Sequence, residues 1–350
     1  MDRMKKMKFS VEPNTGCLSE ENAKRYFSVI GLAAFSLMLV FRLGVLVLSG
    51  LLYRFAPALL SDAVVKHFLN LIPLYCMAFP VFYLILRRLP RGVPSAEPVG
   101  PWQLIGGFGI CLVMTTVGNT VGQFVASFFA SMMGPLSNPT ATLTDGAPFW
   151  VNLVFMAIIP GILEELLIRK VMCDRLLPLG EGYAVVISAV VFGLIHGNFF
   201  QFFYATALGL IFAVIYVKTG KIWITALFHC LINFFGSIVA LWLLEQVAPA
   251  MEESFLIEME KQMAEGNIEA LSAMLDPFML PMLGIFLYEG VALTLMILGL
   301  VYFFKRGRRI KFQKGLLPVP EECRISSVFL NVGAAAALTL FAGVFLLSLL

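Results

Sequence analysis

The most unusual polar residues of this sequence are two adjacent glutamates in an apolar stretch. Glu164 and Glu165 follow FWVNLVFMAIIPGIL, a run that contains no charge. A carboxylate is costly in such surroundings and indicates a functional site or an ion pair. On a helix Glu165 faces Arg169, its i+4 neighbour, whereas Glu164 points about 100° away. The spacing predicts a Glu165–Arg169 ion pair that leaves Glu164 available. The alternative is that both glutamates extend to the inner membrane surface.

The sequence contains three histidines, and two of them lie in apolar surroundings. His67 begins an apolar run and is interpreted as an interfacial residue. His196 ends the segment FGLIH and His229 begins the segment HCLIN. On a helix His196 shares a face with Phe192, and His229 shares a face with Asn233. A lone buried histidine is usually a packed core residue, but two histidines, an asparagine and an unpaired glutamate indicate a site if they meet.

Glu164, His196, His229 and Asn233 are residue types that suit amide hydrolysis without a serine or cysteine nucleophile. A carboxylate acts as a general base on water, and a neighbouring imidazole shares or relays the proton. An asparagine amide and a second histidine can donate to the developing oxyanion. Glu164, His196 and His229 are also acceptable zinc ligands, but the compact HExxH motif is absent. The cofactor is therefore unknown: zinc is one alternative, and the favoured interpretation requires no metal.

These side chains must be positioned by membrane-spanning helices. The 350 residues are 59% hydrophobic and 13% charged, with a mean hydropathy of +0.89, whereas about a quarter of the residues of a soluble domain are charged. Six scattered cysteines without CxxC spacing favour neither a disulfide nor a zinc framework. Spanning a bilayer takes about 20 apolar residues. The sequence therefore predicts an all-α, polytopic transmembrane helical bundle of about nine spans, near residues 26–53, 68–86, 103–133, 148–177, 183–197, 199–217, 222–246, 279–304 and 326–349.

The positions of the basic residues predict how the chain crosses the membrane. Lysine and arginine collect in cytoplasmic segments. With nine spans they fall on the side of the N-terminus, at Arg3, Lys5, Lys6, Lys8, Arg87, Arg88, Arg91, Arg169, Lys170, Arg175, Lys218, Lys221 and the run KRGRRIKFQK at 305–314. The opposite segment 137–148 contains none. We therefore expect an integral, multi-pass plasma membrane protein with a cytoplasmic N-terminus and an outer C-terminus.

The chain is expected to divide into five segments. Residues 1–25 are a cytoplasmic N-terminal segment, 26–144 are N-terminal transmembrane helices, 145–246 are the catalytic core, 247–278 are an acidic outer amphipathic segment, and 279–350 are C-terminal transmembrane helices. In the acidic segment Leu256, Met259 and Met263 recur at helical spacing. This pattern favours a solvated helix on the outer membrane surface, with a docking element as the alternative.

The depths of the polar residues predict that they meet. Glu164 lies about 16 residues before the turn at 177–182 and His196 about 16 after it, so both lie about 24 Å above that turn. His229 and Asn233 lie about 12 and 18 Å above the start of their own helix. These depths place the four residues near one level in the inner half of the membrane. The same arithmetic places Arg42 and Glu289 at matching depths, which predicts a second intramembrane ion pair. The alternative is that Arg42 faces a hydrated cavity and a protonated Glu289 makes no contact with it.

Three segments of the sequence resemble the motifs of a known family. EELLIR (164–169), FGLIH (192–196) and HCLIN (229–233) resemble the EExxxR, FxxxH and HxxxN/B motifs of the CPBP family. That family comprises the type II CAAX prenyl proteases and the bacteriocin-processing or immunity proteins, also called the Abi family. The three motifs occur in the family's order, each on its own predicted span, and the resemblance covers roughly residues 145–245.

The resemblance implies an intramembrane endopeptidase, a hydrolase that cuts a peptide bond of a membrane-associated peptide or protein. Carried over by position, Glu164 activates water with the help of His196, and His229 and Asn233 stabilise the oxyanion. The residues that support the site are Glu165, Arg169 and Phe192. Family members have been described both as metalloproteases and as glutamate-dependent enzymes. The natural substrate, the cleavage site and the recognition of a prenyl group do not follow from the motifs.

Two other functions are compatible with a polar site in a membrane protein. One is a catalytically idle scaffold or immunity factor of the same fold, against which the intact Glu, His, His and Asn set argues. The other is a transporter with a polar midplane site, which predicts internal repeats or matching broken helices that the sequence lacks. The expected partners are a membrane-associated substrate and the lipid bilayer, and no feature indicates nucleic acid.

Overall fold

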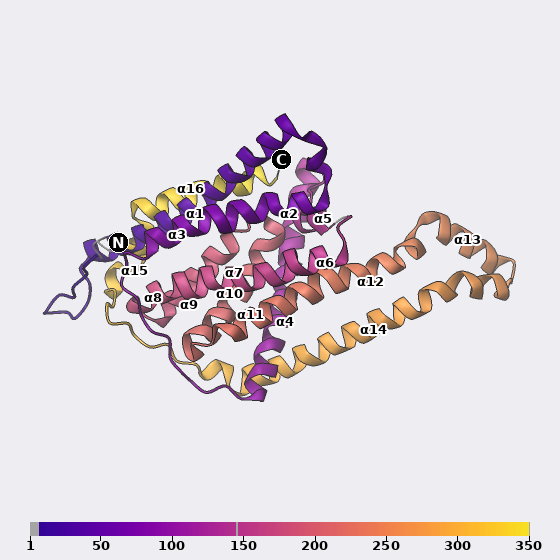
Figure 1. The fold of residues 1–350 in the computed structure, drawn as a ribbon. Coiled ribbons are helices and arrows are strands. Elements are labelled where there is room, and N and C mark those ends of the chain that lie inside the picture. The colour runs from indigo at the N-terminus through magenta and orange to yellow at the C-terminus, as the bar shows by residue number, and fades with distance from the viewer. Residues whose placement is uncertain (1–6, 145, 350) are drawn as a thin grey trace.

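A computed structural model of the protein describes residues 7–144 and 146–349. Within these residues the chain is a bundle of helices without a β-strand, and its extended pairing is limited to the isolated bridges Val11–Leu18 and Gly180–Lys314. Figure 1 shows most of the helices side by side, with one helical arm extending past the bundle. The predicted all-α, multi-span class is confirmed. Arg3, Lys5 and Lys6, used in the charge argument, lie outside the described residues.

The helices follow one another along the chain with short connections. The first half contains α1 (Glu20–Phe55), η1 (Pro57–Ser61), α2 (Ala63–Leu71), η2 (Ile72–Ala78), α3 (Phe79–Leu86), α4 (Pro101–Met133), α5 (Pro139–Thr144), α6 (Phe149–Asn152), η3 (Leu153–Ile158), α7 (Ile159–Glu165), η4 (Leu166–Cys173), α8 (Asp174–Leu176) and η5 (Leu177–Leu179). The second half contains α9 (Glu181–Leu194), α10 (Phe199–Thr219), α11 (Ile222–Phe234), η6 (Phe235–Val239), α12 (Ala240–Val247), η7 (Ala248–Met251), α13 (Glu253–Ala264), α14 (Ile268–Lys305), η8 (Gly307–Arg309), η9 (Glu321–Cys323), α15 (Arg324–Phe329) and α16 (Val332–Leu347).

The number of spans is smaller than the nine predicted. In the described part of the chain seven helices are long and apolar enough to cross a membrane, and the pair Glu321–Phe329 and Val332–Leu347, bent by 50°, makes an eighth if it is one span. The remaining predicted span, residues 183–197, corresponds to α9. Its 14 residues are about 21 Å long, less than the roughly 30 Å hydrocarbon thickness.

Short polar side chains define where several helices begin. The first unpaired N–H groups of a helix need acceptors, and asparagine, aspartate and serine supply them. The N–H of Asn22 donates to Ser19 Oγ at the start of α1. The N–H of Gln201 donates to Asn198 Oδ1 at the start of α10. This second cap separates α10 from α9 and therefore fixes where His196 lies between them.

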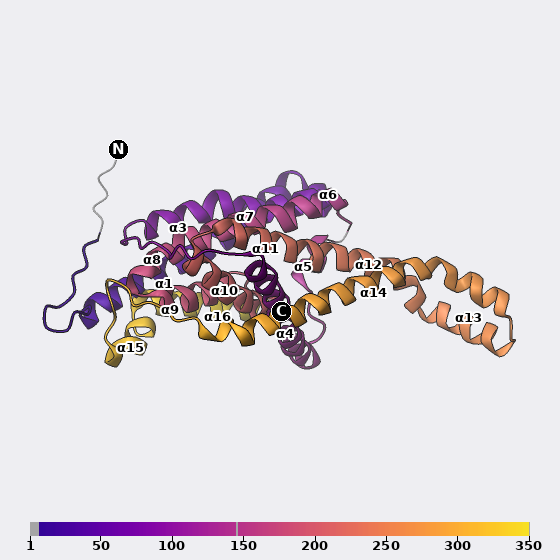
Figure 2. The same cartoon turned by 90° about the horizontal axis from the view of Figure 1, so that it is seen from below.

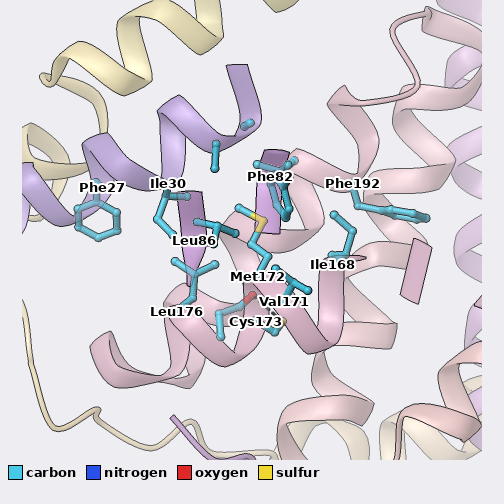
Figure 3. Close-up of a cluster of buried hydrophobic side chains, with 14 of the residues drawn as sticks. Phe27, Ile30, Phe82, Leu86, Ile168, Val171, Met172, Cys173, Leu176 and Phe192 are labelled. Carbon is cyan, nitrogen blue, oxygen red and sulfur yellow. Dashed lines mark hydrogen bonds between the residues drawn. The ribbon is translucent and has the colours of Figure 1, made fainter. Parts of the chain in front are cut away.

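The core of the bundle is formed around α1, α3 and the fourth span. Figure 3 shows Phe27 and Ile30 of α1, Phe82 and Leu86 of α3, and residues of η4 in one buried cluster. Helix α1 also packs on α16, where the backbones of Gly31 and Gly333 approach each other closely. Helix α10 packs between α4 and α9, and α11 packs on α7. The core therefore holds the fourth span in place from several sides.

The acidic segment 247–278 forms part of a helical hairpin. Helices α12 and α14 run side by side, and α13 folds back along the beginning of α14. Figures 1 and 2 both show this arm projecting beyond the end of the bundle. The segment is helical as expected. Its position against a membrane surface stays a prediction.

The predicted Arg42–Glu289 ion pair is wrong. The ion pairs of the described residues do not include it. Helix α1 packs on α16, η2 and α3, whereas α14 packs on α4, α12 and α13, and Figure 1 shows α1 and α14 on opposite sides of the bundle. The Arg42 guanidinium lies against Gly197 instead. Equal depth does not make two helices neighbours.

Candidate active site

A cavity of about 160 Å³ contains the predicted catalytic side chains. It lies among α2, η2, α5, η3, α7, α9, α10, α11 and η6. Its polar lining residues include Glu164, His196, His229 and Asn233, together with His67, Asn70, Tyr75, Thr140, Gln201, Tyr204 and Ser237. The structure therefore brings all four predicted catalytic residues to one cavity. Their catalytic roles stay predictions.

The carboxylate of Glu164 is held at one of its two oxygens. Tyr75 Oη donates to Glu164 Oε1 at 3.4 Å. His229 Nε2 lies 3.9 Å from Glu164 Oε2, too far for a hydrogen bond. Glu164 Oε2 is buried and accepts no hydrogen bond from the described residues. One oxygen of the candidate base is therefore oriented by the protein, while the other is available to a water molecule.

Glu165 and Arg169 form the predicted ion pair. Arg169 Nε donates to Glu165 Oε2 at 3.0 Å, and both side chains are 0% exposed. The guanidinium lies over the rings of Phe192 and Phe212, with Cζ at 5.3 and 5.9 Å from the ring centroids. A buried charge needs a partner and satisfied hydrogen bonds. The ring faces and the ion pair together keep both side chains fixed behind the cavity.

His229 lies between the two glutamates and the rings of Phe192 and Phe212, the second of which lies tilted at 5.6 Å from the His229 ring. Its Nδ1 lies 3.5 Å from Glu165 Oε1, and its Nε2 faces Glu164. Phe192 meets the His229 ring edge-on at 5.6 Å. Helices α7 and α11 approach closely at Gly161, where an added Cβ would lie 2.5 Å from Cys230 Sγ. This glycine is therefore what allows His229 to come within reach of the glutamates.

The ring of His196, which lies just after the end of α9, is fixed by a residue of that helix. His196 Nδ1 lies 2.8 Å from the carbonyl oxygen of Phe192. Because a carbonyl only accepts, Nδ1 must donate, and in the neutral ring Nε2 is then the acceptor. The Phe192 ring also meets the His196 ring edge-on at 5.3 Å. His196 therefore presents a proton acceptor to the cavity that it lines.

Asn233 is anchored to the fourth span. Asn233 Nδ2 donates to the carbonyl oxygen of Met156 at 3.1 Å, and the second N–H of the amide remains available. Met156 lies in η3, one of four π-helical segments in the described chain. Tyr75 lies in η2 and Arg169 in η4. Such segments often occur at functional sites, and here three of them bear side chains or carbonyls that hold the candidate site.

The sequence motifs do not identify the other polar residues of this cavity, and Tyr75 and His67 are the clearest examples. Tyr75 lies two residues after Pro73 in the apolar run LIPLYCMAF and is a polar group that needs a partner. His67 was interpreted as interfacial, but it is 2% exposed and stacks on Phe155 with centroids 5.5 Å apart. Both residues come from the second span, outside the three motifs, so motif matching had no means of finding them.

Comparisons with known proteins agree with this local picture. Residues 146–235 match the family "Type II CAAX prenyl endopeptidase Rce1-like". The predicted resemblance to the CPBP family is confirmed. The chain is also 32% identical over 90 residues to the "Putative membrane peptidase YdiL" of Bacillus subtilis (strain 168), a match that covers 25% of this chain and 37% of that protein. No solved structure matches the chain. The family match and the apolar helices together support an integral, multi-pass membrane protein.

The CPBP resemblance raises the question of a metal, because family members have been described with and without one. The candidate ligands would be Glu164, His196 and His229. In residues 7–144 and 146–349 no group of three histidine, cysteine, aspartate or glutamate side chains is placed to hold a metal ion. His229 also directs Nδ1 to Glu165 and Nε2 to Glu164. The arrangement of these side chains in the described residues does not fit a zinc site as it stands.

Proposed function

We propose that the protein is an intramembrane endopeptidase of the CAAX-protease type, which hydrolyses a peptide bond of a membrane-associated peptide or protein. The observation that carries the proposal is the buried Glu164 oxygen without a hydrogen bond in a cavity that also contains His196, His229 and Asn233. A general base, an imidazole and two oxyanion donors at one cavity are the groups that amide hydrolysis requires.

The first step is the attack of water on the substrate carbonyl. A water molecule that donates to Glu164 loses one proton to this carboxylate while its oxygen bonds to the carbonyl carbon. His196, with its acceptor nitrogen in the cavity, holds the second hydrogen of the same water. The carbonyl oxygen becomes an oxyanion, and the free N–H of Asn233 donates to it. His229 donates through Nε2 when its ring carries a proton on both nitrogens, so that Nδ1–H can still face Glu165.

The second step breaks the carbon–nitrogen bond. The tetrahedral intermediate collapses, the carbonyl re-forms, and the proton held by Glu164 passes to the leaving nitrogen as it becomes an amine. The products are a carboxylic acid and an amine. Glu164 is a carboxylate again as soon as its proton has passed to the nitrogen, and the new acid loses its own proton to solvent. Glu165 and Arg169 take no part in proton transfer. They keep the His229 ring in its orientation through the 3.5 Å contact with Nδ1.

Comparison of membrane peptides in cells tests the proposed activity and identifies substrates at the same time. Cells that produce wild-type protein are compared with cells that produce Glu164→Gln, and membrane-anchored peptides and their released fragments are quantified. We expect fragments that occur only with the wild type. Glu260→Gln, a change in the exposed helix α13, is the matched control and should behave as wild type. Identical peptide profiles for wild type and Glu164→Gln would contradict the proposal.

We expect Tyr75→Phe to lower kcat by about 10- to 100-fold with little change in KM. The phenol is the hydrogen-bond donor to Glu164 Oε1, and a hydrogen bond to a charged group contributes about 1.5–3 kcal/mol. The substitution removes only the hydroxyl, and the phenylalanine ring keeps the packing of the tyrosine ring. Steady-state kinetics on purified protein measures the effect, with Tyr53→Phe, an exposed tyrosine, as control. A change in KM alone would contradict a positioning role.

We expect the purified protein to hold no stoichiometric zinc and to keep its activity in the presence of a chelator. The reason is that Glu164, with His196 and His229, supplies a complete base and donor set. Elemental analysis of the purified protein, combined with peptidase assays before and after chelation, measures both quantities. Zinc present at one ion per chain, lost together with activity and restored together with it, would overturn this expectation.

A further inference from the structure

A second cavity, larger than the catalytic one, lies between α9 and the pair formed by α1 and α16. Its volume is about 800 Å³, within the range of ligand cavities of roughly 300–1,000 Å³. It shares no lining residue with the catalytic cavity. Helix α1 packs directly on α16, and α9 packs directly on α10. The cavity lies between the α1–α16 pair and α9.

The walls of this cavity are apolar and its mouth faces outward from the bundle. Phe27 and Ile30 of α1, Ile187 of α9 and Phe341 of α16 line it. At the mouth, Val186 is 54% exposed and Leu338 is 47% exposed. When these helices lie in a bilayer, such a mouth opens toward the hydrocarbon chains of the lipid. An apolar chain can therefore enter from the side.

One end of the cavity is polar, and its position is fixed by the fold. Lys314 and Gln313 line that end. The segment that bears them is tied to the start of α9 by the Gly180–Lys314 bridge and by the Gln313 N–H, which donates to Glu181 Oε2 at 2.8 Å. Glu181 is itself paired with Lys218 at 2.6 Å. The lysine at this end is therefore held at a defined position relative to the apolar walls.

The charge at the polar end is positive. Arg324 also lines it but is paired with Glu321 at 2.9 Å, whereas the described residues provide no ion pair for Lys314. Lys314 also ends the basic run KRGRRIKFQK at 305–314. Clusters of lysine and arginine directly next to a transmembrane helix attract anionic lipid head groups, with about 1 kcal/mol per basic residue near the surface.

We propose that this cavity binds a phospholipid with an anionic head group, with one acyl chain between α9 and the α1–α16 pair and the phosphate at Lys314. A lipid fits both ends, since the long apolar walls accept a chain and the fixed lysine accepts a phosphate. The site is separate from catalysis, and a bound lipid takes the place of packing contacts between the two helix pairs.

Native mass spectrometry tests this site independently of peptidase activity. The full chain is reconstituted in vesicles of equal parts phosphatidylcholine and phosphatidylglycerol, extracted in mild detergent, and weighed with its bound lipids. We expect one phosphatidylglycerol per chain. Lys314→Glu should reduce that retention by about tenfold or more, while Lys261→Glu, in the distant helix α13, should leave it unchanged. Val190 also lines the cavity, one turn after Val186 on α9, and is partly exposed. Val190→Trp adds bulk there and should reduce retention of the lipid.

Three outcomes would overturn the proposal. These are the absence of retained lipid on the wild type, equal retention of phosphatidylcholine and phosphatidylglycerol, and retention that neither Lys314→Glu nor Val190→Trp changes. A second copy of the chain or a co-purified peptide in place of the lipid would overturn it as well. Circular dichroism and elution volume of each variant separate loss of lipid from loss of fold. If the wild-type protein retained the lipid but cleaved no peptide, the proposed peptidase activity would fail while the lipid site would stand.

Discussion

Glu164→Gln is expected to lower kcat by about 10²–10⁴-fold, the usual effect of removing a positioned general base. Glutamine has the size of glutamate and can still accept from Tyr75 at the Oε1 position, but its amide cannot take a proton from water. The fold should be unaffected because the Glu165–Arg169 pair, which is buried behind the cavity, remains. Single-turnover cleavage of a membrane-anchored peptide measures the effect on the chemical step.

The neighbouring glutamate provides a sharp comparison for that experiment. Glu165→Gln removes the charge that holds Arg169 and faces His229. We therefore expect it to lower thermal stability as well as activity, whereas Glu164→Gln lowers activity alone. Glu260→Gln on the exposed α13 controls for loss of a surface charge. Purified Glu164→Gln protein with full activity would show that the base has been assigned to the wrong residue.

The candidate site could be predicted because polar residues in apolar spans follow helical geometry. The i+4 rule alone separates Glu165, which pairs with Arg169, from Glu164, which does not, and the structure shows this pair. The rise of 1.5 Å per residue then places residues of three helices at one depth. Because α9 follows the fourth span after a short turn and α11 packs on α7, residues at equal depth here also line one cavity.

The same reasoning fails where the neighbouring helix is not known. Arg42 and Glu289 lie at matching predicted depths, yet α1 and α14 lie on opposite sides of the bundle (Figure 1). Which helices are neighbours depends on contacts between residues far apart in sequence, such as the Gly31–Gly333 approach. The contact of Tyr75 with the site could not be predicted for a similar reason, because its partner Glu164 lies 89 residues away in the sequence. The spacing of the apolar residues does not distinguish the π-helical segments from the α-helices around them, so these segments could not be predicted.

Arg169→Met is expected to produce the largest loss of stability of any single change in the site. The guanidinium and the Glu165 carboxylate are both 0% exposed, and breaking a buried pair by removing one partner costs about 3–5 kcal/mol because a charge is left uncompensated. Methionine retains much of the apolar stem of Arg169 but removes the guanidinium that lies over Phe192 and Phe212. Thermal unfolding of the purified protein in one detergent gives the comparison with the wild type.

The double variant Glu165→Gln, Arg169→Met decides whether the loss comes from the stranded charge or from packing. With neither charge present, much of the stability should return, because replacing both members of a buried pair is often close to neutral. Lys24→Met, which removes one member of the half-exposed pair with Glu20, should have little effect. If the losses of the two single variants simply add in the double variant, the ion pair does not stabilise this site and Arg169 acts through packing alone.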